Sequence, residues 1–165
     1  MTGKERIGNV LKKQPVDRIP IFEHFWGDTY YAYLEQGHLK EGESLEDHFG
    51  LDMQIFWPFN LKANLDFEDK VIEETEETVT ILDGNGTTLR HHKLHDTTPE
   101  HVDFSVRCFE DWKKYKPYLL EVDDRRINYE GYRKAKEEAK RANRFFCWSG
   151  VNVFESMHPI CGHEN

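Results

Sequence analysis

Glu23, His24, Phe25 and Trp26 place a carboxylate, an imidazole and two large rings at the end of a short apolar run. Such a set can hold a small molecule, because aromatic rings stack on a flat face and an imidazole titrates near neutral pH. Neighbouring residues of a strand point to opposite faces, so Glu23 is expected to face away from a pocket that His24 enters. His24, Phe25 and Trp26 are therefore predicted to bind substrate. A histidine satisfied within the core is the alternative for His24.

Two later apolar runs end in a similar way. Trp57 and Asn60 follow the run LDMQIF, and Trp148 and Asn152 follow RFFC. An indole can stack on a ligand, and a side-chain amide can donate to a carbonyl or carboxylate. Core packing is the alternative for each tryptophan, and a cap at a strand end is the alternative for each asparagine. We predict a pocket bounded by His24, Trp57 and Trp148.

Two histidine-containing stretches raise the question of a metal ion: HHKLH, with His91, His92 and His95, and HPICGH, with His158, Cys161 and His163. If the first stretch is a strand, the first and third of its histidines share one face and the second lies opposite, which is a poor tripod. A tetrahedral site on the second stretch needs a fourth ligand. We therefore predict no metal site, and a metal-binding module built on His91 and His95 is kept as a further hypothesis.

Alternating helices and strands are expected to position these residues. Thr2 and Glu5 form a T-x-x-E capping box that starts the first helix. Asp17 and Arg18 are expected to pair and to anchor the strand that follows. Apolar runs predict strands over 18–25, 51–58 and 144–150. Helical spacing predicts helices over 2–11, 28–37, 110–120 and 129–143. Two further helices are predicted to begin at Ser44 and at Phe154. This order predicts an α/β fold with a parallel sheet.

A different pattern covers about residues 70–95. β-branched residues lie on both sides of Asp83-Gly84-Asn85-Gly86. Gly and Asn accept the positive φ of tight turns, so this stretch predicts an inserted β-hairpin.

Composition limits the classes of partner. The chain has 165 residues and a net charge of −9 spread along its length, which disfavours nucleic acid and anionic membranes. No apolar run approaches the roughly 20 residues of a membrane span, and the first residues lack a signal core. Three cysteines without a C-x-x-C pair suit a reducing compartment. These features predict a cytoplasmic protein with a small-molecule substrate.

Several stretches also carry a family resemblance, in this order: TGKERIGNVLKKQPVDRIPI, FGLDMQIF, DGNGTTL, TPEHVDFSV, EDWKKYK and GVNVFESM. Together they resemble the uroporphyrinogen decarboxylase superfamily, closer to its corrinoid-dependent methyltransferase-like branch. The resemblance covers nearly the whole chain. It implies a TIM (β/α)8 barrel whose pocket opens at the carboxyl ends of the strands, where the candidate residues lie. The implied ligand is a tetrapyrrole or a corrinoid-linked methyl donor.

Two departures from the family pattern concern its catalytic residues. True decarboxylases carry Arg-Gln-Ala-Gly-Arg after the first strand, where this chain has Phe25-Trp26-Gly27-Asp28-Thr29. The family's catalytic aspartate falls on Phe59, and a phenyl ring cannot stabilise a cation as a carboxylate does. No catalytic residue is therefore assigned, and whether the chain is an enzyme is left open. The zinc ligands of the methyltransferase branch, a His-x-Cys and a distant Cys, would lie beyond Asn165.

A complete barrel of this type takes about 250 residues. Three parallel strands cannot close, so we expect residues 1–165 to form a single partial domain, the N-terminal part of such a barrel with the hairpin inserted. The alternative function is a non-catalytic half-barrel that assembles with a complementing chain or as a homo-oligomer. A compact open α/β domain that uses the hairpin as a lid is the structural alternative.

Overall fold

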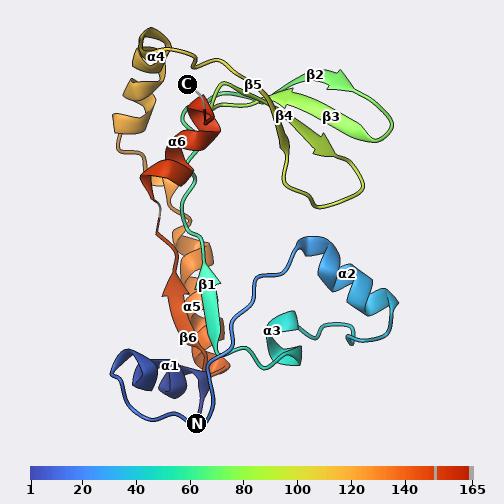
Figure 1. Ribbon diagram of the computed structural model, residues 1–165, viewed down its shortest axis with the longest axis vertical. Coiled ribbons are helices and arrows are strands. Elements are labelled where there is room, and N and C mark those ends of the chain that lie inside the picture. Colours follow the sequence, from blue (N-terminus) through green and yellow to red (C-terminus); the bar gives the residue numbers. More distant parts are fainter. Residues whose placement is uncertain (151, 164–165) are drawn as a thin grey trace. The chain divides into compact units, whose positions relative to one another are not determined.

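The computed structural model describes residues 1–150 and 152–163, so predictions that reach Val151, Glu164 or Asn165 lie outside the described residues there. Helices and strands are mixed, which confirms the α/β class (Figure 1). The chain forms two compact units. Met1–Phe59 and Ile127–Gly150 make up what we call the parallel-sheet unit. Asn60–Arg126 and Val151–Asn165 make up the antiparallel-sheet unit.

The parallel-sheet unit is built on two strands and the helices that pack on them. Its elements are α1 (Gly3–Leu11), α2 (Gly27–Glu35), α3 (Leu45–His48), β1 (Met53–Phe56), α5 (Tyr129–Arg141) and β6 (Phe145–Trp148). β1 and β6 run parallel, with Met53 opposite Phe145 and Phe56 opposite Trp148. Helix α5 packs on both strands and buries Ala135 and Ala139, two residues of its small-residue stripe. Small side chains allow this close approach of a helix to a sheet.

The strand predicted over 18–25 is wrong, because this segment is an irregular extended loop. Pro20 has no N–H to give to a ladder. The N–H of Ile21 donates to the side chain of Asp52 (2.7 Å) rather than to a backbone carbonyl. In return, the N–H of Asp52 donates to the carbonyl of Ile21 (2.9 Å). The apolar run is not buried either, since Ile19 is 83% exposed.

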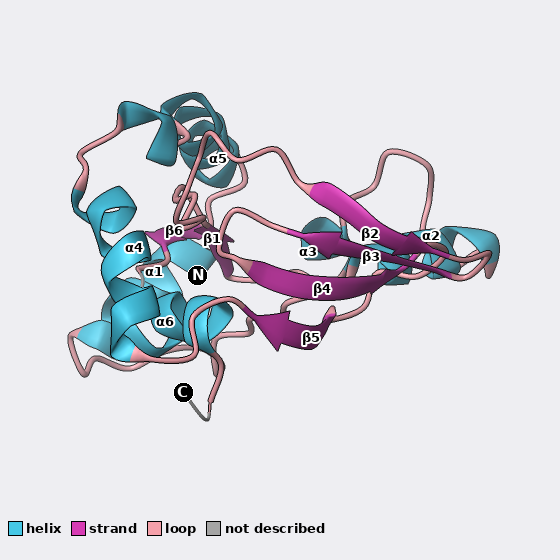
Figure 2. Ribbon diagram, turned by 90° about the horizontal axis from the view of Figure 1, so that it is seen from above, coloured by secondary structure: helices cyan, strands magenta, loops and turns pink. Residues whose placement is uncertain are grey.

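The antiparallel-sheet unit contains the predicted turn. Its elements are β2 (Lys70–Glu74), β3 (Thr78–Leu82), β4 (Thr87–His92), β5 (Glu100–Phe104), α4 (Phe109–Leu120), the short 3-10 helix η1 (Asp124–Arg126) and α6 (Val153–Cys161). The strands lie in the order β2-β3-β4-β5 (Figure 2). Asp83 Oδ1 accepts from the N–H groups of Asn85 (2.9 Å) and Thr87 (3.0 Å), and Gly86 takes a φ of 75°. The predicted hairpin is the β3–β4 pair, and β2 on one side and β5 on the other extend it to a four-stranded sheet.

Helices α4 and α6 pack around the core of the antiparallel-sheet unit. Ala63, Val106 and Ile160 are its buried centre, with Trp112 and Tyr115 packed against them. Thr87 Oγ1 donates to the carbonyl of Pro159, which joins α6 to β4. The predicted helix from Phe154 thus exists, and it packs against β4 and the core of this unit.

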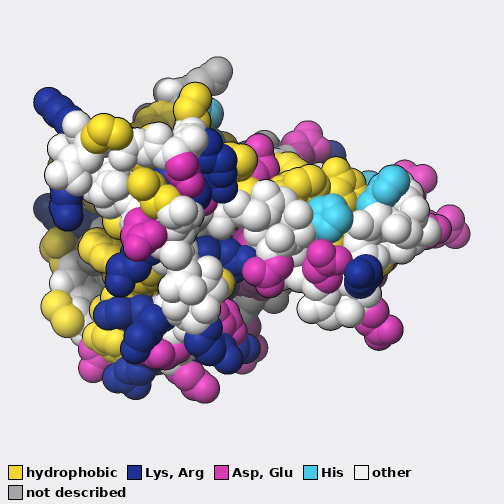
Figure 3. Space-filling view, turned by 90° about the horizontal axis from the view of Figure 1, so that it is seen from below, with side chains coloured by type: hydrophobic (Ala, Val, Ile, Leu, Met, Phe, Trp, Pro, Cys, Tyr) yellow, Lys and Arg dark blue, Asp and Glu magenta, His cyan; other side chains and the backbone are white. Residues whose placement is uncertain are grey.

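The described residues form no closed barrel. Of the three parallel strands that the sequence predicts, β1 and β6 are present and form a sheet of their own. No helix among residues 1–150 and 152–163 has the length and apolar character to cross a membrane. On the face shown in Figure 3, basic and acidic side chains are interspersed rather than separated into patches of one sign.

The start of α1 gives a first test of the local interactions. Thr2 Oγ1 accepts from the N–H of Glu5 (3.2 Å), and the Glu5 carboxylate accepts from the N–H of Thr2 (2.8 Å), as the sequence predicts. Replacing Thr2 with Ala should lower the free energy of unfolding by about 1 kcal/mol, because an orphan helix N–H loses its partner. Urea unfolding measures this, and Thr2→Ser, which keeps the hydroxyl, should behave like the parent chain. Equal losses in both variants would contradict the cap.

Candidate functional site

A cavity of about 560 Å³ lies in the parallel-sheet unit, between residues 22–27 and β1. Its lining comprises residues 22–27, 30, 45, 46, 53–55 and 57. This size falls within the range of small-molecule sites. One side of the cavity is thus formed by a loop rather than by a strand, and β1 contributes Met53, Gln54 and Ile55 to the lining.

Four of the seven predicted binding residues line this cavity: His24, Phe25, Trp26 and Trp57. His24 is exposed at the rim, so it is no core histidine. Glu23 also lines the cavity, and the expectation that it faces away is wrong. That expectation assumed the alternation of a strand, which a loop does not follow.

The other three predicted residues are placed elsewhere. Trp148 packs edge-on against Phe59, with ring centroids 5.8 Å apart, and does not line the cavity. Asn60 and Asn152 belong to the antiparallel-sheet unit. Asn60 Oδ1 accepts from the N–H of Lys62 (3.0 Å), and Asn152 Oδ1 accepts from the N–H of Glu155 (2.8 Å) at the start of α6. Both amides therefore cap backbone, which is the alternative that the sequence leaves open.

Aromatic side chains give the cavity one fixed wall and two open surfaces. Phe25 stacks on Phe49 with ring centroids 5.4 Å apart and an interplanar angle of 19°. Phe49 is held in turn by Tyr33, at 6.0 Å. Trp26 and Trp57 are 52% and 63% exposed. Their indoles are thus accessible to a ligand, whereas Phe25 is fixed by its neighbour.

The polar side chains of the cavity favour a ligand that donates hydrogen bonds. Gln54 Oε1 is buried and has no hydrogen-bond partner among the described residues. A buried acceptor without a partner costs about 1–3 kcal/mol. Glu23 and Glu46 add carboxylates, and among the described lining residues there is no Lys or Arg. The sequence prediction missed Gln54, an amide within the apolar run MQIF.

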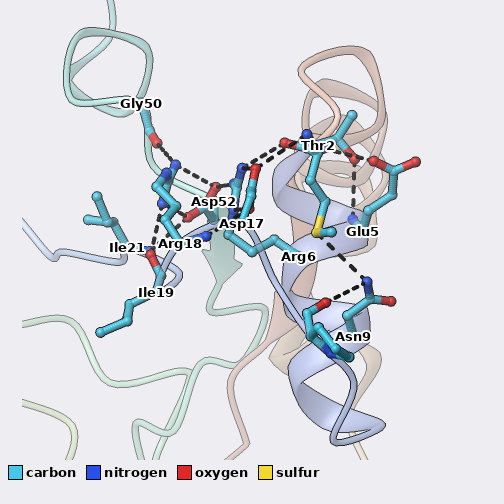
Figure 4. A network of polar contacts seen from close by, with 12 residues as sticks. Thr2, Glu5, Arg6, Asn9, Asp17, Arg18, Ile19, Ile21, Gly50 and Asp52 are labelled. Carbon is cyan, nitrogen blue, oxygen red and sulfur yellow. Dashed lines mark hydrogen bonds and ion pairs between the residues drawn. The ribbon is translucent and has the colours of Figure 1, made fainter.

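A buried ionic network, shown in Figure 4, fixes one wall of the cavity to β1. Asp52, directly before β1, is 2% exposed. Its carboxylate accepts from Arg18 Nη1 (2.6 Å) and Nη2 (3.0 Å), from an Arg6 Nη1, and from the N–H of Ile21 (2.7 Å). One carboxylate therefore joins α1, the loop at 17–21 and β1.

The ion pairs and hydrogen bonds of this network favour the charged form of Asp52 and of Asp17. Burial raises the pKa of Asp52, but the hydrogen bonds from Arg18 and Ile21 outweigh it and hold the pKa below its ordinary value. The hydrogen bonds from Arg6 hold the pKa of Asp17 well below its ordinary value. The predicted Asp17–Arg18 ion pair is wrong in detail, since Asp17 pairs with Arg6 (2.6 Å) and Arg18 pairs with Asp52. Both residues still anchor the segment, as expected.

The histidine stretches are arranged differently from the sequence prediction. Strand β4 ends at His92, so the chain turns and the rings of His92 and His95 approach to 4.7 Å instead of opposing each other. Across residues 1–150 and 152–163, no group of three or more His, Cys, Asp or Glu side chains is arranged to hold a metal ion. The cavity beside β1 thus remains the candidate site.

Comparison of the chain with protein-family models, with curated proteins and with solved structures gives no match. The cavity and the sequence motifs are therefore the features of this chain that bear on function. Of these, the cavity can be tested residue by residue.

Proposed function

We propose that this chain is a small-molecule-binding protein of the uroporphyrinogen decarboxylase superfamily and that the cavity beside β1 takes a flat ring system. The cavity itself carries the proposal, since exposed Trp26 and Trp57 border it and Gln54, Glu23 and Glu46 are among its lining residues. In this proposal β1 and β6 are strands of the N-terminal part of a (β/α)8 barrel. The β2–β5 sheet is then the insertion between them. The motifs of the first twenty-one residues support this assignment.

The chemistry of the lining favours one branch of the superfamily. Uroporphyrinogen is rich in carboxylates, which need cationic partners such as arginine. The cavity presents Glu23 and Glu46 instead, and Phe25–Thr29 stands where decarboxylases carry two arginines. We therefore favour the corrinoid-dependent methyltransferase-like branch over tetrapyrrole decarboxylation. In this role the chain's own residues bind and orient the ring: the indoles stack on it, and the carboxylates of Glu23 and Glu46 accept from donors at its edge.

A second candidate function is a non-catalytic half-barrel that assembles with a complementing chain or with a second copy. The two-stranded β1–β6 sheet favours it, because so small a sheet is marginal alone and leaves strand edges open to pairing. Light scattering across a range of concentrations separates the candidates. A monomer that binds a flat ligand supports the first, and a dimer whose formation competes with ligand supports the second.

Binding can be tested by calorimetry with cobinamide, a corrinoid without the nucleotide loop, and with uroporphyrin as the carboxylate-rich probe. Trp26→Ala and Trp57→Ala should each weaken cobinamide binding about five- to tenfold, which corresponds to about 1 kcal/mol of lost stacking. Uroporphyrin should bind more weakly than cobinamide because of the two glutamates.

Trp148→Ala is the matched control, since Trp148 is similarly exposed (51%) but lies outside the cavity lining. Its affinity for cobinamide should equal that of the parent chain. An equal loss in all three variants, or no binding of either ring by the parent chain, would remove the proposed function.

A further inference from the structure

Three imidazoles meet in the antiparallel-sheet unit, where α6 lies on the sheet. We call His101 on β5, His158 on α6 and His163 just after α6 the imidazole cluster. The ring centroid of His158 is 4.9 Å from that of His101 and 4.0 Å from that of His163. Aromatic rings flank two of the three imidazoles, with Phe104 stacked on His101 at 5.6 Å and Phe154 stacked on His158 at 5.8 Å.

The cluster lies where α6 packs against the rest of the antiparallel-sheet unit. Ile160 is fully buried against the core of this unit, and Thr87 binds the carbonyl of Pro159. At the end of α6, Gly162 adopts a φ of 69° and passes so close to Phe104 that an added Cβ would lie 2.8 Å from the ring. The contacts of α6 on both sides of the cluster therefore hold the three imidazoles together.

Few negative charges face the cluster among the described residues. Asp83, in the turn before β4, is the carboxylate close enough to affect His101, and its oxygens already accept from Asn85 and Thr87. Glu155 on α6 is exposed, one turn before His158. Along β4, His91 shares the face of Leu89, which is the residue opposite His101, so this face adds another imidazole rather than an anion. Protonated rings would thus meet like charges.

We propose that the imidazole cluster is a proton-sensitive latch, which holds α6 on the sheet while the rings are neutral and releases it when they become protonated. Two imidazolium ions at a separation of 4–5 Å repel each other, and the partial burial of His101 and His158 reduces the screening by water, whereas His163 is exposed. Release of α6 separates the rings and exposes them to solvent, where each can carry its charge.

The direction of the pH effect follows from His101. Burial first, and then the charge of His158, lower the pKa of His101 below its ordinary value. A histidine with a lowered pKa in the closed state binds protons more readily in the open state, so closing weakens as pH falls below the ordinary histidine pKa of about 6.5. The closed state is fully stable above that pH. Each proton taken up on release increases the opening constant up to about tenfold per pH unit.

Hydrogen exchange followed by mass spectrometry measures this opening directly. After correction for the intrinsic exchange rate, amides in α6 should exchange at least tenfold faster at pH 5.0 than at pH 7.5, while amides in β3 remain protected. His101→Gln should abolish most of this pH dependence. His38→Gln, which removes an exposed histidine of the parallel-sheet unit, is the matched control and should leave the pH dependence unchanged.

Two results would overturn the latch. One is equal protection of α6 at both pH values in the parent chain. The other is loss of protection in β3 and α6 together, which would mean that the whole unit unfolds in acid. If His101→Gln fails to fold, NMR titration of the parent chain's imidazole protons decides: the latch requires at least one ring of the cluster to titrate below pH 6.5, in step with exchange in α6. Rings that titrate without any change in α6 would contradict it.

Discussion

Replacing Asp52 with Ala should lower the free energy of unfolding of the parallel-sheet unit by about 3 kcal/mol or more. Removal of one partner from a buried ion pair leaves the other charge without compensation, and this typically costs about 3–5 kcal/mol. Here the variant leaves Arg18 without its ion-pair partner and the backbone N–H of Ile21 without its acceptor, and the buried Arg6 keeps only one of its two carboxylates, that of Asp17. Urea unfolding of this unit can be followed by tryptophan fluorescence, because three of the four tryptophans, Trp26, Trp57 and Trp148, belong to it and Trp112 belongs to the other unit.

The stability of the parent chain should fall in acid as the carboxylate of Asp52 becomes protonated. Because the pKa of Asp52 is lowered in the folded state, its contribution is present above the unfolded-state pKa of about 3.9 and is lost as pH falls through the folded-state pKa. The Asp52→Ala variant should lack this part of the acid transition. Glu41→Ala, at an exposed carboxylate, is the control and should change stability by less than about 0.5 kcal/mol. A similarly small effect at Asp52 would contradict the role assigned to the network.

Replacing Ile160 with Ala should cost the antiparallel-sheet unit about 3 kcal/mol. The side chain is fully buried between Ala63 and Val106, so truncation leaves a cavity as well as losing apolar contact. Because Ile160 lies on α6, hydrogen exchange of α6 should rise before that of β3. Trp112, which packs against this core, reports the loss by fluorescence.

Ile19→Ala gives a matched control for Ile160, because it makes the same chemical change at a side chain that is 83% exposed. Its effect should be within about 0.5 kcal/mol of zero. Equal losses of unfolding free energy at the two positions would show that Ile160 of α6 is not packed in the core as described.

Local signals predicted much of the fold. Thr2 with Glu5 and Ser44 with Asp47 cap the helices that the sequence assigns to them. The turn at 83–86 also depends on residues close in sequence. Such features are visible in a sequence because the interacting groups lie within a few residues of each other.

Long-range pairing was not predictable in the same way. Residues 18–25 read as a strand, but Pro20 and the side chain of Asp52 take the place of a ladder. The partner choice within the network depends on Arg6 reaching residues 11 and 46 positions away. Gln54 was missed because an amide within an apolar run gains meaning only once its oxygen is found buried without a partner.

The most direct test of the account locates a bound ring on the chain. A ¹⁵N-labelled sample titrated with cobinamide should show ring-current shifts centred on the amides of residues 22–27 and 53–57, and Trp57→Ala should reduce them. Saturable shifts confined to those two segments are what the proposed site predicts. Shifts centred elsewhere, or no shifts at a cobinamide concentration well above that of the protein, would contradict it.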